Sequence, residues 1–124
     1  MKACSLNYRD FLMINNTDSL YSFTIPIQYP KAGTINSAVR VGVVSTSGGP
    51  TTWIKLPGDL RDDYVPRMEW VDANRLLVQR VNRLQNTNRV LLANAATGAV
   101  RDVITERDSA WLDVVNDMTM LADD

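Results

Sequence analysis

The sequence predicts an all-β protein made of antiparallel strands. Two observations predict it: apolar and polar side chains alternate in short runs, and turn-forming residues separate these runs at regular spacing. The clearest series is residues 80–106, RVNRLQNTNRVLLANAATGAVRDVITE, which contains a strand, a turn, a strand, a glycine turn and a third strand. Such a series is typical of a meander, in which each strand pairs with the next one along the chain.

The first element, residues 10–29, combines a short apolar run, a polar NNTDS turn and an alternating stretch. In that stretch Phe23, Ile25 and Ile27 alternate with other residues at a period of two, which indicates a strand. Pro26 has no backbone N–H to give to a ladder, so we expect this strand at an edge or in an extended arm. The YPKAG segment that follows is expected to turn.

A hairpin is predicted next. Valine-rich residues 37–47 form its first strand, Gly-Gly-Pro at 48–50 breaks that strand, and residues 51–57 return. The following GDLRDD segment, 58–63, is predicted to be a loop.

Residues 64–108 are predicted to form four short strands joined by tight turns. Residues 75–85 also fit a helical stripe, but the turn residues on both sides favour a strand. Four strands of this length have the size of one propeller blade. A fresh strand is expected to begin at Ser109, and the chain continues from it without a partner.

The expected organisation is therefore about two blades of a β-propeller, made of antiparallel four-stranded meanders. Residues 10–60 are the predicted first blade, with an extended arm at 16–33; 64–108 form a complete blade, and 109–124 start the next. Because one blade buries its faces on its neighbours, we expect a section of a longer repeat.

Composition narrows the function classes. With 13 Lys and Arg against 14 Asp and Glu, the formal charge of −1 gives no electrostatic footprint for nucleic acid. The basic residues of the predicted sheet are scattered and are expected to lie on solvated strand faces: Arg75, Arg80, Arg83 and Arg89. The single cysteine, Cys4, cannot form an internal disulfide. Arg9 and Asp10 interrupt the apolar start, so no signal peptide and no transmembrane segment is predicted.

Catalytic motifs are missing from the sequence. There is no histidine, which excludes a Ser-His-Asp triad, a Cys-His pair and a histidine-ligated zinc site within this chain, and no G-x-S-x-G is present. The adjacent carboxylates Asp62–Asp63 and Asp123–Asp124 are interpreted as solvated loop charges, which leaves a carboxylate-only enzyme as a remote alternative. No catalytic residue, cofactor or metal is therefore assigned.

Two further features are given their simplest interpretation. One tryptophan near each blade strand is more typical of core or inter-blade packing than of a ligand pocket, and this applies to Trp53, Trp70 and Trp111. Asn15-Asn16-Thr17 is a formal N-glycosylation sequon, which has no meaning in a bacterial protein.

Four motifs occur in the order found in one enzyme family. They are YPKAG at 29–33, V-R-x-G-V-V at 39–44, VNRLQN at 81–86 and E-x-D-x-x-W-x-D at 106–113. Over residues 10–118 the sequence resembles the propeller domain of dipeptidyl peptidase IV-type serine exopeptidases.

The resemblance implies a two-domain parent, in which a propeller caps an α/β-hydrolase domain that carries Ser, Asp and His. That parent would release N-terminal dipeptides with Pro or Ala at the second position, using a glutamate pair that precedes the matched segment. Some members reach the substrate just after the W-x-D motif, where this chain has Val114, Val115 and Asn116. The implied partners are the remaining blades, the hydrolase domain and, in the whole parent only, a peptide substrate. The location stays open, since the resemblance is compatible with a periplasmic, secreted or membrane-anchored parent.

The family also implies an arm that crosses a dimer interface and ends in YPKAG, matched here by about residues 16–33. The expected interface residues are Leu20, Tyr21, Phe23, Ile25, Ile27, Tyr29 and Pro30. The alternative is that this strand packs on the chain's own blade. We therefore predict a non-catalytic propeller segment that serves substrate gating and dimerisation and self-associates through exposed strand edges. The competing hypothesis is a stand-alone β-sheet module for protein–protein interaction.

Overall fold

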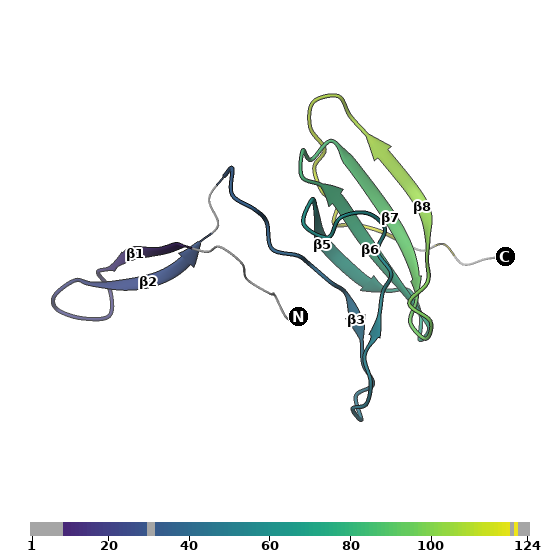
Figure 1. Ribbon diagram of the computed structural model, residues 1–124, viewed down its shortest axis with the longest axis horizontal. Helices are drawn as coiled ribbons and strands as arrows, with labels where there is room; N and C mark the ends of the chain where they lie inside the picture. Colours follow the sequence, from purple (N-terminus) through teal and green to yellow (C-terminus); the bar gives the residue numbers. More distant parts are fainter. Residues whose placement is uncertain (1–8, 30–31, 120, 122–124) are drawn as a thin grey trace.

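The computed structural model describes residues 9–29, 32–119 and 121, and these form three antiparallel sheets (Figure 1). The first two sheets have two strands each: β1 (Arg9–Asn15) with β2 (Phe23–Tyr29), and β3 (Gly42–Val43) with β4 (Thr52–Trp53). The third has four: β5 (Asp63–Trp70), β6 (Arg75–Asn82), β7 (Thr87–Asn94) and β8 (Val100–Arg107). Their order in the sheet is their order in the sequence, so the predicted all-β meander is confirmed.

The β1–β2 hairpin projects away from the four-stranded sheet (Figure 1). Its turn is held by the carboxamide of Asn15, whose Oδ1 accepts hydrogen bonds from the backbone N–H groups of Thr17 and Asp18. An asparagine that bonds the backbone two and three residues on mimics a backbone turn, which is why the NNTDS segment reverses the chain. Pro26 lies opposite Leu12 in a sheet of only two strands, so it occupies an edge as its missing N–H predicts.

The turns of the meander use the same chemistry. Asp72 accepts hydrogen bonds from the backbone N–H groups of Asn74 and Arg75 between β5 and β6, and Asn94 caps the turn between β7 and β8. Gly98 completes that second turn with φ +70°, and a Cβ atom there would overlap the carbonyl oxygen of Trp53. This position therefore needs glycine both for its backbone angle and for its contact with β4.

The core lies on both faces of β6 and β7. On one face Leu76, Val78, Leu91 and Ala93 pack against Val41 and Ile54. On the other face Leu77 and Val81 are also buried, and the chain after β8 crosses there, with Gln79 Nε2 donating to the carbonyl of Val115 at 2.8 Å. The two central strands are therefore covered on both faces by the segments that precede and follow the sheet, whereas β8 is exposed.

The hairpin predicted over 37–57 is much shorter than expected, since only β3 and β4 pair there. One further bond, from Ile54 N to Val41 O, continues the pairing, but beyond it the amides bond elsewhere: Val39 N donates to Leu60 O, and Lys55 N donates to Gly98 O. The helical alternative for 75–85 is wrong, because β6 pairs with β5 on one side and β7 on the other.

Residues from Ser109 onward form no ladder strand within the described part of the chain, although Leu112 N donates to Gln85 O at 2.7 Å. The division into blades at 10–60, 64–108 and 109–124 stays a prediction. Across the described ranges no helix is long and apolar enough to cross a membrane.

The tryptophans are not buried in the core of the described chain, since Trp53, Trp70 and Trp111 are each about half exposed. The other half of the prediction, packing between blades, stays a prediction. Trp53 stacks under the guanidinium of Arg40, 3.8 Å from its ring centroid, and Trp111 Nε1 donates to Asp113. The rings of these two tryptophans are therefore held at the surface by polar partners.

Candidate interaction sites

The predicted interface residues lie on the projecting hairpin. Side chains alternate along a strand, so Phe23, Ile25, Ile27 and Tyr29 share one face of β2. Phe23 and Ile25 are about two-fifths exposed, and Tyr29 is more exposed. Leu20 and Tyr21, in the turn, are 90% and 80% exposed, whereas Pro30 lies outside the described residues. The structure thus gathers most of the predicted set on one exposed element.

Apolar side chains also emerge from β1. Met13 lies opposite Ile25 on the shared face, and Leu12 and Ile14 are about two-thirds exposed on the reverse face. A hollow of about 430 Å³ is lined by Met13, Ile14, Ile25, Ile27 and the turn residues Asn15–Thr17. An isolated two-stranded hairpin is only marginally stable in water, and this one exposes apolar side chains on both faces. From here on we call this hairpin, residues 9–29, the arm; it overlaps the predicted arm at 16–33 and adds β1.

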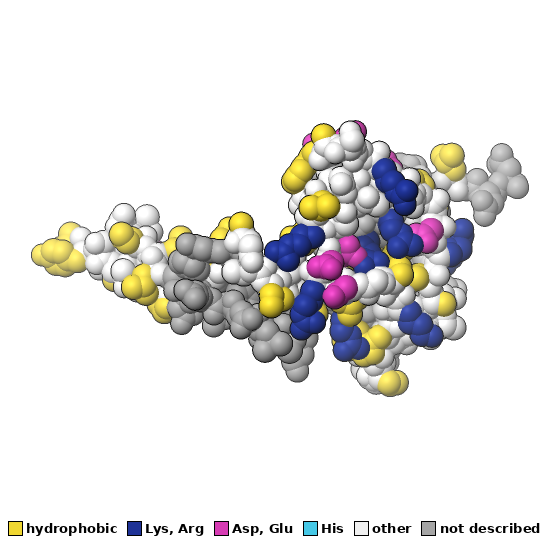
Figure 2. Space-filling view, turned by 45° about the horizontal axis from the view of Figure 1, so that its top comes forward, with side chains coloured by type: hydrophobic (Ala, Val, Ile, Leu, Met, Phe, Trp, Pro, Cys, Tyr) yellow, Lys and Arg dark blue, Asp and Glu magenta, His cyan; other side chains and the backbone are white. Residues whose placement is uncertain are grey.

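Charged side chains, unlike the apolar ones of the arm, lie mainly on the rest of the molecule. On the face shown in Figure 2, basic and acidic side chains gather over the part of the molecule away from the projecting hairpin, which shows mainly apolar and neutral side chains. An exposed apolar element next to a charged body is typical of an interaction surface.

A row of four charges crosses the four-stranded sheet. Arg80 on β6 lies directly opposite Arg89 on β7. Arg80 pairs with Asp63 of β5, and Arg89 donates to both carboxylate oxygens of Asp102 on β8, at 2.8 and 2.6 Å. Burial, together with the positive charge of Arg89, lowers the pKa of Arg80. The hydrogen bond from Arg89 lowers the pKa of Asp102.

The prediction that the sheet arginines lie on solvated faces is wrong for Arg80, whereas Arg75 and Arg83 are exposed and Arg89 is half-buried. Arg80 is only 5% exposed, and its guanidinium sits against Gly58. The acid on each outer strand neutralises the base on the neighbouring inner strand, so the row offers no net charge to a phosphate backbone.

Two buried carboxamides lie on the opposite face of β6 and β7. Gln79 donates to Val115 O, and Asn88 Nδ2 donates to Glu106 Oε2 at 3.0 Å. Gln79 Oε1 and Asn88 Oδ1 have no partner in the described part of the chain. Sequence reasoning missed this pair, although the signal was available: polar residues occur inside otherwise apolar strands, where they must find partners.

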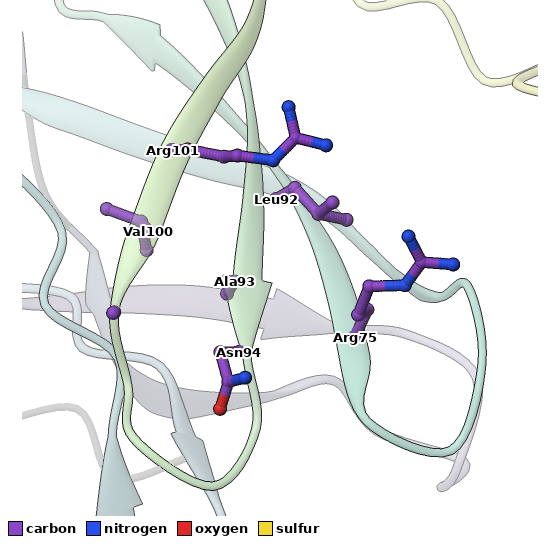
Figure 3. Close-up of a pocket in the computed structure, with 7 residues that line it drawn as sticks. Arg75, Leu92, Ala93, Asn94, Val100 and Arg101 are labelled. Atoms are coloured by element: carbon purple, nitrogen blue, oxygen red, sulfur yellow. The ribbon is translucent and has the colours of Figure 1, made fainter.

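A shallow hollow of about 270 Å³ lies beside β8 (Figure 3). Leu92 lies between Arg75 and Arg101, whose side chains extend toward the same side of the sheet. Arg75 is paired with Asp72 at 2.5 Å, whereas no carboxylate of the described residues forms an ion pair with Arg101. The hollow has no nucleophile or base in its lining.

The interpretation of Asp62 and Asp63 as solvated loop charges is correct for Asp62 and wrong for Asp63, which begins β5 and is mostly buried. Asp63 is paired with Arg80, whereas Asp62 is exposed and uses its backbone in the loop; Asp123 and Asp124 lie outside the described residues. The described ranges contain no group of three His, Cys, Asp or Glu side chains that could hold a metal ion. Val114 is half-buried, while Val115 and Asn116 are exposed, in the segment that crosses the sheet.

A family model described as "Dipeptidyl peptidase IV (DPP IV) N-terminal region" matches residues 9–124. The chain belongs to this family. Inactive dipeptidyl peptidase 10 of Mus musculus is 30% identical in an alignment of 128 positions, which covers 92% of this chain and 16% of that protein. Prolyl endopeptidase FAP of Mus musculus is 36% identical over 77 residues, or 57% of this chain and 10% of the relative.

Solved structures agree with the family match. The crystal structure of Porphyromonas gingivalis dipeptidyl peptidase 4 aligns with a TM-score of 0.74 and 25% identity, over 88% of this chain and 16% of that one. A putative dipeptidyl aminopeptidase IV from Bacteroides ovatus shows the same fold, with a TM-score of 0.68 and 24% identity, over 84% of this chain and 15% of that chain. The chain therefore spans about one sixth of the length of the first relatives it matches, and its meander corresponds to part of the family's N-terminal propeller region.

Proposed function

We propose that this chain is a non-catalytic propeller segment of a dipeptidyl peptidase IV-like serine peptidase, and that its arm mediates dimerisation. The observation that carries the proposal is the arm itself: it exposes Ile25 and Phe23 on one face and Leu12 and Ile14 on the other. Apolar strands that project from a charged body gain free energy when a partner covers them. The proposal is supported by the resemblance of residues 10–118 to dipeptidyl peptidase IV-type peptidases, which implies an arm at about residues 16–33.

The catalytic part of the proposal concerns the parent protein. The chain has no histidine, so a Ser-His-Asp triad would come from a hydrolase domain elsewhere in the parent, together with the glutamates that hold the substrate amine. In this proposal the blade contributes to the wall that gates peptide access. The relatives differ in what their names state: one is an inactive dipeptidyl peptidase, and another is the venom dipeptidyl peptidase 4 of Vespula vulgaris.

Sedimentation of the native protein tests the arm. Ile25→Asp places a charge on the apolar face of β2 and is expected to convert a dimer to monomers, because an unpaired buried carboxylate is strongly disfavoured. The matched control is Val103→Asp, which places the same charge on an exposed apolar position of β8. The proposal is wrong if both variants keep the dimer, or if both lose it.

The parent's size and activity are tested in the source cells. An antibody raised against this chain should detect a protein several times longer than the chain. The purified protein should release N-terminal dipeptides from peptides that have Pro or Ala at the second position. A protein of the size of this chain would instead support the alternative, a stand-alone β-sheet interaction module. The observation that favours that alternative is β8, whose residues Arg101–Arg107 are all exposed along one sheet edge.

A further inference from the structure

The segment that follows the arm is fastened by three hydrogen bonds to β5, to the loop before β5 and to the turn after β6. Arg83 Nη2 donates to the backbone carbonyl of Thr34 at 2.7 Å. Asn36 Nδ2 donates to the hydroxyl oxygen of Tyr64 at 3.1 Å, and Val39 N donates to Leu60 O at 3.1 Å. We call these six residues the arm anchor: Thr34, Asn36, Val39, Leu60, Tyr64 and Arg83.

The backbone of Arg83 is held in place by hydrogen bonds on both sides. Its own backbone N–H donates to Asp62 O at 2.8 Å, next to the loop that carries Leu60. The turn that follows is closed by Asn82, whose Oδ1 accepts hydrogen bonds from the N–H groups of Asn86 and Thr87. Because both ends of the turn are bonded, the guanidinium group reaches Thr34 from a backbone held on two sides.

No carboxylate pairs with Arg83 in the described residues, which distinguishes it from Arg67, Arg75, Arg80 and Arg89. Its side chain donates to the backbone carbonyl of Thr34, so it acts as a charged donor to the chain that follows the arm. Tyr64 fits the same role, since its ring belongs to β5 while its hydroxyl faces the segment after the arm.

We propose that the arm anchor sets the angle at which the arm leaves the blade, with Arg83 and Tyr64 as positioning residues. The arm is a long lever: a strand of seven residues spans about 24 Å at about 3.4 Å per residue. A change of about 10° at the base therefore moves the tip by about 4 Å, more than the length of a hydrogen bond. For the interface, this inference rests on the proposed function of the arm.

The arm angle is measured first, without reference to dimerisation. Spin labels are placed at exposed Asn16→Cys in the arm and exposed Ala96→Cys in the blade. The background is the native protein with Cys4→Ser and with any reactive cysteine outside this chain replaced as well. Labelled protein is diluted with unlabelled protein, so that only distances within one chain are recorded by double electron–electron resonance. Arg83→Met and Tyr64→Phe are compared with Arg101→Met, which removes an exposed arginine far from the anchor.

The expected result is a broader or shifted distance distribution for Arg83→Met and Tyr64→Phe, and an unchanged one for Arg101→Met. Arg83→Lys should restore part of the order, because it keeps a charged donor but not the planar guanidinium. The inference is wrong if the distance distributions of all four variants equal that of the labelled protein without these substitutions. Equal circular dichroism spectra verify that each variant has folded.

The dimer dissociation constant is then a second readout. A lost charge-assisted hydrogen bond at the base of the arm is expected to weaken a dimer about tenfold, since about 1.4 kcal/mol corresponds to that factor. If the protein sediments as a monomer while the spin-label distances still respond to Arg83→Met, the proposed dimer function fails and the anchor stands. If a dimer forms and neither readout responds, the anchor fails and the dimer function stands.

Discussion

Arg80 and Arg89 lie side by side across the central ladder of the meander, and each is neutralised from the strand on its outer side. Asp63 pairs with the buried Arg80, and Asp102 pairs with the more exposed Arg89. Two like charges directly opposite each other destabilise a sheet unless acids compensate them. Since one pair is buried and the other is at the surface, the two acids should contribute very differently to stability.

Asp63→Ala should therefore destabilise the chain far more than Asp102→Ala. Removing Asp63 leaves Arg80, which is 5% exposed, as an unpaired buried charge, and such a loss costs about 3 kcal/mol. Removing Asp102 breaks a pair whose side chains are 33% and 49% exposed, which is worth about 0.5 kcal/mol. Urea unfolding followed by tryptophan fluorescence measures both. Equal losses in the two variants would contradict the role given to burial.

Two glycines separate backbone strain from crowding. Gly48 has φ +86° with nothing near its missing Cβ, so Gly48→Ala should cost only the strain of a left-handed backbone, about 1 kcal/mol. Gly98 has φ +70°, but a Cβ there would overlap the carbonyl oxygen of Trp53. Gly98→Ala should therefore cost clearly more and separate the β7–β8 turn from β4. The urea unfolding midpoints of the two variants measure this difference. Similar midpoints would show that the β7–β8 turn moves away from Trp53 without further loss of stability.

The pKa of Asp102 should depend on one side chain. The hydrogen bond from Arg89 holds the pKa of Asp102 below its ordinary value. A carboxylate with a depressed folded-state pKa stabilises the fold above its unfolded pKa of about 3.9, and this contribution is lost as the pH falls through the folded-state pKa. In Arg89→Gln we expect the pKa of Asp102 to return toward its ordinary value. Carbon-13 NMR titration of the carboxylate measures it.

Asp72 provides the contrast. Its pKa is lowered first by the backbone N–H of Asn74, and the side chain of Arg75 is the second cause. Arg75→Gln should therefore leave the pKa of Asp72 below its ordinary value. A complete return in that variant would contradict the assignment of the main cause to the turn backbone.

The meander could be predicted from the sequence because its determinants are local. Strand alternation and the turn residues Asp72 and Asn94 act on the segments next to them, and the structure uses them as expected. The length of the hairpin over 37–57 could not be predicted, because it depends on partners that are distant in the sequence. One of them is the carbonyl oxygen of Gly98, which accepts a hydrogen bond from the backbone N–H of Lys55.

The difference between local determinants and distant partners also explains why some individual side chains were predicted wrongly. Arg80 was expected to be solvated because its partner, Asp63, lies on another strand and cannot be identified from the spacing. The apolar residues of β2 could be named from their alternation. The hydrogen bond from Arg83 to Thr34 O joins positions 49 residues apart, so no local pattern in the sequence indicates it. Periodicity indicates which face a side chain occupies, but its partner follows only from the fold.

Gln79→Leu tests whether the buried carboxamide stabilises the fold or only fixes the segment that crosses it. The substitution removes the bond to Val115 O and also removes Oε1, which is buried without a partner in the described chain. Because a buried unpaired acceptor costs about 1–3 kcal/mol and one hydrogen bond contributes about 1 kcal/mol, we expect unchanged or slightly higher stability in urea. At the same time the amide of Leu112, which bonds to Gln85 O in the crossing segment, should exchange its hydrogen faster. Marked destabilisation would show instead that Oε1 has a donor in solution.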